Sequence, residues 1–238
     1  MVEPQPGWAP VGPFPPALDP ALRGLLRPAA WGLLLVLADL FLVPGTAQLD
    51  VLPDVLGWAL LAVAGLRAAS SAVPVLPRTV LVAASCVATV TSLVSALSLL
   101  GVLPRPDGAP TVAGALTVQA RVGLWGEPGG WPAGWGQEAA TDVATVAALL
   151  ACGALLAVVT AVVTAAAHPS ARGWRGLARL WPVAVTPFAV LVLAAPHVEG
   201  GPLGVVLLVL GVLGVLTAFV VLLVADVRLF GLLRAVPR

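Results

Sequence analysis

Three aspartates near the N-terminal end of the chain, Asp39, Asp50 and Asp54, are the residues best suited to chemistry. Asp39 interrupts one apolar run, whereas Asp50 and Asp54 open the next one. Carboxylates within membrane-length apolar segments are costly, so they are functional candidates by default. No arginine lies inside these apolar runs to pair with them. The cluster therefore predicts a site for a cation or a proton, unless the same residues have a structural use.

That structural use is the start of a helix. Pro53 suits a first helical turn, where the missing backbone N–H has no cost. Asp50 or Asp54 can accept hydrogen bonds from the free N–H groups of that turn and complement the positive end of the helix dipole. Gly57 would allow a second helix to approach closely, and Asp39 would reach interfacial water. On this interpretation the aspartates bind no ligand.

The same block carries a family resemblance. Residues 50–58 have the sequence Asp-Val-Leu-Pro-Asp-Val-Leu-Gly-Trp and lie between two apolar runs. An apolar hairpin joined by Asp-x-Leu-Pro-Asp-x-x-Gly-aromatic resembles a family of small uncharacterised bacterial multi-pass membrane proteins. The resemblance covers residues 33–70 and implies a recurring hairpin but no reaction. Its signature positions would be Asp50, Pro53, Asp54 and Gly57.

The composition excludes a soluble protein. The 238 residues are 60% hydrophobic and 10% charged, with a mean hydropathy of +1.04. Soluble domains carry about 25% charged residues, so this chain cannot cover a surface that faces water. A net charge of +1 provides no long-range field for nucleic acid. We expect the lipid bilayer as the main partner, together with other membrane proteins or further copies of the chain, and no nucleic acid.

Six apolar segments predict an all-α, polytopic transmembrane bundle. A spanning helix needs about 20 residues, which the third, fourth and sixth segments provide, whereas the other three are short and need flanking residues or local thinning of the bilayer. Residues 21–238 would form one membrane domain, and the proline-rich residues 1–20 a disordered cytoplasmic tail. The predicted helices are 29–43, 51–66, 79–103, 142–167, 180–195 and 202–225.

The arginines predict the orientation of this bundle. All of them except Arg105 and Arg121 fall on one side of the apolar segments, and the chain has no lysine. Because positively charged loops stay in the cytoplasm, both termini should be cytoplasmic and the loop 104–141 extracytoplasmic. We therefore predict a multi-pass protein of the cell membrane, specifically a bacterial inner membrane.

Further residues are assigned to the cytoplasmic side. Residues 172–179, with three arginines, are placed in the connection between the fourth and fifth helices. Trp174 and Trp181 are interpreted as interfacial anchors, because indole rings concentrate at the headgroup level. Asp226, beside Arg228, is interpreted as a surface charge.

Three features would favour transport. The segments 29–66 could form a re-entrant loop, which would place their aspartates near the midplane and requires a cavity or surrounding protein. Pro187 removes a backbone donor and predicts a kink in the fifth helix. Hydroxyls on the third helix could form a polar path, or could bond to carbonyls of their own helix. The hydroxyl residues are Ser85, Thr89, Ser92 and Ser95.

Sequence signatures of enzymes are missing. The chain has no His-Glu-x-x-His, no Gly-x-Ser-x-Gly, no phosphate-binding glycine loop and no dinucleotide fingerprint. We therefore predict no catalytic residue, no cofactor, no metal site and no enzyme. The leading hypothesis is a non-catalytic accessory or structural membrane component that acts through helix–helix contacts. The alternative is a small transporter, or an ion- or proton-coupled permease, that uses Asp39, Asp50 and Asp54.

Overall fold

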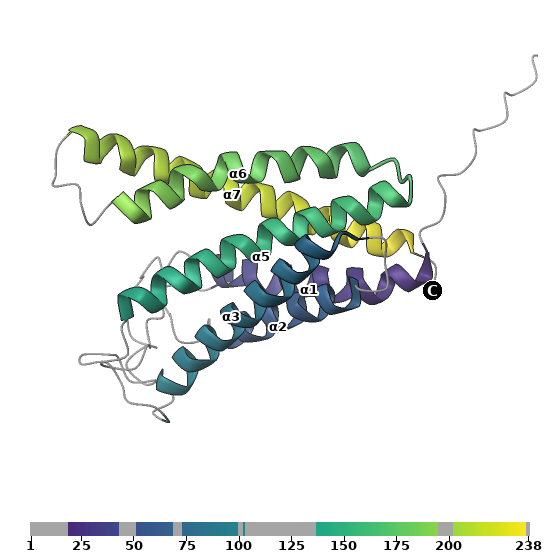
Figure 1. The fold of residues 1–238 in the computed structure, drawn as a ribbon, viewed down its shortest axis with the longest axis horizontal. Coiled ribbons are helices and arrows are strands. Elements are labelled where there is room, and N and C mark those ends of the chain that lie inside the picture. Colours follow the sequence, from purple (N-terminus) through teal and green to yellow (C-terminus); the bar gives the residue numbers. More distant parts are fainter. Residues whose placement is uncertain are drawn as a thin grey trace, which may run out of the picture.

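The computed structural model describes residues 19–42, 51–68, 73–99, 102, 137–194 and 202–236. Within these residues the chain is all-helical, without strands, as predicted. The short 3-10 helix η1 (Pro20–Leu22) leads into the first α-helix (Figure 1). The α-helices are α1 (Arg23–Leu42), α2 (Val51–Arg67), α3 (Val75–Leu99), α5 (Gln137–Ala165), α6 (Ala171–Ala194) and α7 (Pro202–Ala235).

The helices form a closed ring. Each helix packs against the next one along the chain, and α1 also packs against α7. Figure 1 shows the start of α1 and the end of α7 at the same end of the bundle. We call this end the basic end, because nine arginines of the described helices lie in its turns. They are Arg23, Arg27, Arg67, Arg78, Arg172, Arg175, Arg179, Arg228 and Arg234.

Helix α5 is the most enclosed of the long apolar helices. It also contacts α2 across the ring. Its candidate membrane span is 61% buried, against 28% for that of α3 and 35% for that of α7. Fully buried Leu155, Leu156 and Val158 place it at the centre of the apolar core.

In the part of the chain that the structure describes, three helices are long and apolar enough to cross a membrane, namely Val75–Val94 of α3, Val143–Ala165 of α5 and Gly204–Ala235 of α7. They correspond to the three predicted segments of sufficient length. Large apolar side chains along α3 and α7, such as Val90 and Leu216, are exposed on the outside of the bundle. A contiguous apolar exterior is a liability in water but suits contact with lipid chains.

Four helices are longer at the basic end than the sequence predicts. Helix α1 begins at Arg23 rather than at residue 29, and α3 begins at Val75 rather than at residue 79. The largest differences are in α6 and α7. Helix α6 begins at Ala171 rather than at residue 180, and α7 continues to Ala235 rather than ending at residue 225. Arginine is a good helix former, so a charged stretch ends an apolar run without ending a helix. The first half of α6 is amphipathic: its three arginines are exposed, whereas Trp174 and Trp181 are buried. These two indoles are therefore packing residues, not the interfacial anchors that the sequence predicts.

Candidate functional site

The predicted hairpin is present as two antiparallel helices in close contact. A Cβ atom added at Gly57 of α2 would lie 2.8 Å from Val36 Cγ2 and 3.0 Å from the carbonyl oxygen of Gly32 in α1. A Cβ atom at Gly32 would lie 2.9 Å from the carbonyl oxygen of Gly57. The two backbones therefore touch where the helices cross, as small residues allow in membrane proteins. This contact leaves no space for a ligand between α1 and α2 at that level.

Asp54 and the backbone of Asp39 lie at the end of this hairpin opposite the basic end. Asp54 is half-buried in the first turn of α2, and Pro53 precedes it in the same turn. Asp39 belongs to the last turns of α1. Asp50 and the side chain of Asp39 lie outside the described residues. The structure thus brings the backbones of Asp39 and Asp54 to one end of the bundle, and the cation site remains a prediction.

At the basic end, a proline and an arginine join the two helices of the hairpin. Pro28 lies inside α1 and has no N–H to donate to the carbonyl of Gly24, four residues earlier. Arg67 Nη1, from the last turn of α2, donates to this carbonyl oxygen at 3.0 Å. The arginine therefore satisfies the acceptor that the proline leaves free, and it fixes the open end of the hairpin.

Asp226 corrects one interpretation of the sequence. It is only 5% exposed, so it is a buried residue and not a surface charge. It does not share a face with Arg228, because two residues on a helix are separated by roughly 200°. Within the described residues, its Oδ1 atom has no hydrogen-bond partner. A buried carboxylate inside an apolar helix is a functional candidate. The sequence did not indicate this, because Arg228 two residues away suggested a surface charge.

The hydroxyls of α3 differ in their bonding: Thr89 and Thr91 bond within the helix, whereas the buried Ser85 Oγ has no hydrogen-bond partner in the described residues. Thr89 Oγ1 donates to the carbonyl of Ser85 at 2.7 Å, and Thr91 Oγ1 bonds to the carbonyls of Val87 and Ala88. These are bonds within one helix, of the kind that serine and threonine commonly form. The side chain of Ser95 lies outside the described residues. The polar path therefore stays a prediction.

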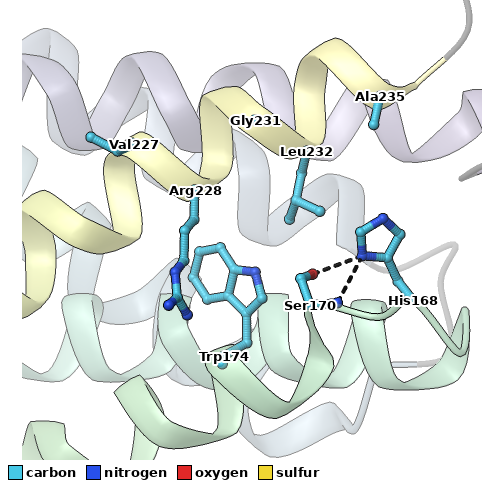
Figure 2. A pocket seen from close by; sticks show the side chains of 9 residues that line it. His168, Ser170, Trp174, Val227, Arg228, Gly231, Leu232 and Ala235 are labelled. Carbon is cyan, nitrogen blue, oxygen red and sulfur yellow. Dashed lines mark hydrogen bonds between the residues drawn. The ribbon is translucent and has the colours of Figure 1, made fainter.

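A pocket at the basic end was not foreseen. It lies between the start of α6 and the last turns of α7, with a volume of about 500 Å³ (Figure 2). His168 and Ser170 stand on one side and Arg228 on the other, with Trp174 between them. Serine is a common residue directly before a helix, so Ser170 could have indicated this end of α6. Sequence reasoning missed the pocket because it placed residues 172–179 in a loop.

No protein-family model, curated protein or solved structure matches the chain. Within the described ranges, no group of three histidine, cysteine, aspartate or glutamate residues could hold a metal ion. The function is therefore argued from the geometry of the chain.

Proposed function

We propose that this chain is a multi-pass inner-membrane protein that acts as a non-catalytic accessory or structural component through helix–helix contacts. The observation that supports this most is the closed ring of helices around an apolar core. Close backbone contacts between helices, such as the one between Gly32 and Gly57, tighten the ring. A protein built in this way presents an outer surface to partners and has no cavity for a substrate along the α1–α2 crossing.

The proposed topology has six membrane-crossing helices with the basic end in the cytoplasm. The nine arginines at the basic end support it, because positive residues stay on the cytoplasmic side. The order of the helices also supports it, since neighbours along the chain alternate in direction. Helices α1 and α2, with 20 and 17 residues, would be about 30 Å and 25 Å long. Such lengths come close to the hydrocarbon thickness of about 30 Å.

Cysteine accessibility tests this topology. In a chain with Cys86 and Cys152 replaced by alanine, single cysteines at Thr46, Gln48 and Gly129 are treated with an impermeant thiol reagent on intact cells. We expect all three positions to react from outside. Reaction at Gly129 alone would show that the α1–α2 hairpin does not cross the membrane, and would favour a re-entrant hairpin.

Transport is the second candidate, and Asp226 is the observation that favours it. This residue is buried in α7, and Oδ1 lacks a hydrogen-bond partner within the described residues. It lies towards the basic end, whereas Asp39 and Asp54 lie at the opposite end of the bundle. Acidic groups at two depths are a feature of proton pathways through membranes. A permease would need a route between them, and the buried polar residues of the described interior, besides Asp226, are Ser85, Thr91 and Thr145.

Flux measurements separate the two functions. The purified protein is reconstituted into liposomes, and proton and sodium fluxes are compared with those of empty liposomes. A structural component should show no excess flux, and the substitutions Asp54→Asn and Asp226→Asn should change only its thermal stability. A flux that disappears in Asp226→Asn, while the unfolding temperature stays the same, would replace the structural proposal with transport.

A further inference from the structure

The pocket at the basic end faces the positive end of a helix. Helix α5 ends in a turn in which the N–H of His168 donates to the carbonyl of Val163, and Ala167 has a positive φ of 50°. The first i to i−4 bond of α6 runs from the N–H of Trp174 to the carbonyl of Ser170, at 3.1 Å. Of the earlier N–H groups, that of Ala171 donates to the carbonyl of His168 at 3.0 Å, whereas those of Arg172 and Gly173 have no acceptor within the helix. Ser170 and Gly173 line the pocket, so the N-terminal turn of α6 borders it.

The start of α6 is held in place by a histidine and a serine. His168 Nδ1 lies 2.7 Å from Ser170 Oγ, and the backbone N–H of Ser170 donates to the same nitrogen at 3.3 Å. Because Nδ1 accepts this backbone bond, we assign the ring proton to Nε2. The bonds of Ser170 to the imidazole thus stabilise the turn. The Nε2–H of His168 is not part of these bonds and can donate to a group in the pocket.

Trp174 contributes a donor that is not used. The side chain is fully buried, at 0% exposure, and Nε1 has no hydrogen-bond partner within the described residues. A buried N–H without an acceptor is unfavourable, and buried indole groups usually find a partner. In Figure 2 the nitrogen edge of the indole is turned towards the side of the pocket where Ser170 and Leu232 stand. An acceptor that reached this edge of the ring from the pocket would satisfy the N–H.

Arg228 supplies the charge. Its guanidinium group lies against the backbone of α6 at Gly173, where an added Cβ atom would be 3.0 Å from Cζ and 3.3 Å from Nη2. Residues 143–194 and 202–236 contain five arginines and one acidic residue, Asp226. Asp226 faces a different side of α7 from Arg228. The pocket therefore lies in a positive field, with donors and few acceptors.

We propose that this pocket binds the phosphate group of an anionic lipid. Arg228 would pair with the phosphate, and the N–H groups of Trp174 and of the first turn of α6 would donate to its oxygens, as helix N-termini commonly do. Val227, Leu232 and Ala235 form an apolar wall suited to the glycerol backbone and the start of an acyl chain. The volume of about 500 Å³ lies within the usual range of ligand sites.

A lipid is favoured over a soluble phosphate by the surroundings of the pocket. Exposed arginines of α6 lie beside it, and the basic end would face the cytoplasmic leaflet, which carries anionic headgroups. The inference rests on the membrane placement given under Proposed function but not on the absence of transport. The pocket could therefore fail to bind lipid even if the protein shows no flux, and it could bind lipid even if the protein proves to be a transporter.

Native mass spectrometry of the detergent-solubilised full chain tests this. Dioctanoyl phosphatidylglycerol, dioctanoyl phosphatidylcholine and sodium phosphate are each titrated, and the apparent Kd of the first bound molecule is compared. We expect phosphatidylglycerol to bind at least about tenfold more tightly than either of the others, which corresponds to roughly 1.4 kcal/mol. Phosphatidylcholine carries a cationic choline group that opposes Arg228, and sodium phosphate lacks the acyl chains that would contact the apolar wall. Equal binding of sodium phosphate would show a site for soluble phosphate and would overturn the lipid assignment.

Two variants and a matched control locate the binding. Arg228→Gln and Trp174→Phe should each weaken phosphatidylglycerol binding about tenfold. Arg234→Gln removes the same charge from the same helix outside the pocket, and should change the Kd less than about twofold. If Arg228→Gln and Arg234→Gln weakened phosphatidylglycerol binding equally, the effect would come from general surface charge. That result would contradict binding in the pocket.

A second readout separates ligand binding from folding. Trp174→Phe removes an N–H that makes no bond in the described residues, so the unfolding temperature should stay close to that of the parent chain. In ¹⁵N spectra, the indole N–H signal of Trp174 can be assigned because it is missing from the spectrum of Trp174→Phe. It should shift when phosphatidylglycerol is added to the parent chain. An unchanged signal at saturating lipid would contradict the proposed contact.

Discussion

The seam between α1 and α2 and the seam between α6 and α7 both depend on a glycine, but they place different atoms against it. At Gly57 the nearest neighbours include backbone atoms of Gly32 and Val36. At Gly173 the neighbours are the end of the Arg228 side chain. The first contact is closed and apolar, whereas the second borders a pocket with a charged group.

The difference shows what a small residue can provide. Where backbone meets backbone, the glycine fixes the distance between two helices, and neither side can move without separating them. Where backbone meets a flexible side chain, the glycine gives that side chain a resting place near the helix start. Glycine thus serves packing at Gly57 and positions an arginine at Gly173. Further along the α6–α7 seam, Gly214 again meets backbone, since an added Cβ atom would lie 2.7 Å from the carbonyl oxygen of Ala184.

The largest effect is expected for Gly57→Ala. The added methyl group would lie within 3.0 Å of the backbone oxygen of Gly32 and within 3.1 Å of the backbone nitrogen of Val36. Because neither backbone can give way locally, we expect a loss of about 1–3 kcal/mol in the free energy of unfolding. Denaturant titration of the protein in detergent micelles, followed by circular dichroism, measures it.

Gly176→Ala is the matched control. Gly176 lies in α6, and no atom outside its own turn lies within 4 Å of an added Cβ. Alanine is the better helix former, so this change should stabilise the chain by about 0.5–1 kcal/mol. Equal effects of the two substitutions would mean that helix propensity, and not the contact with α1, decides the result at Gly57.

The closed seam was largely predictable from the sequence, because glycine at the start of an apolar segment indicates close helix packing. Its partner Gly32 was not predictable, since many small residues in this chain offer the same pattern. The pocket and the burial of Asp226 were not predictable for a different reason. Both depend on how far α6 and α7 extend and on which faces of α7 pack against neighbouring helices. The ends of the apolar segments in the sequence determine neither of these two properties.

A smaller effect is expected for Arg67→Gln. This change removes the donor to the Gly24 carbonyl, which Pro28 leaves free of its helical partner. We expect a loss of about 1 kcal/mol, measured by the same titration. Arg78→Gln, also at the basic end, removes an equal charge and should change the stability by less than about 0.5 kcal/mol.

A second substitution sharpens this result. Pro28→Ala restores the backbone N–H that can donate to Gly24, so Arg67→Gln should cost less in that background than in the parent chain. A double-mutant cycle isolates this coupling. Additive effects of the two substitutions would show that Arg67 stabilises the hairpin in some way other than through this carbonyl.

Ala167→Gly should stabilise the turn that precedes the pocket. Ala167 follows the end of α5 with φ at 50°. This conformation is unfavourable for a residue with a Cβ atom and usual for glycine after a helix end. The bonds from Ala167 to Thr164 and from His168 to Val163 show that the turn is otherwise well formed. We expect a gain of about 0.5–1 kcal/mol. A lower unfolding temperature in this variant would contradict the expected relief of strain.

The smallest effect on stability, and the most direct test of the comparison, is expected for Gly173→Ala. The methyl group would occupy the place of the Arg228 guanidinium, whose flexible side chain can turn away towards solvent. Helix propensity favours alanine, so the unfolding free energy should change by less than about 1 kcal/mol, in contrast to Gly57→Ala. Phosphatidylglycerol binding should nevertheless fall, because the charge no longer lies beside the first turn of α6. Unchanged lipid binding would mean that Arg228 does not need to lie beside the first turn of α6 to bind the phosphate. Gly173 would then serve only the packing of α6 against α7.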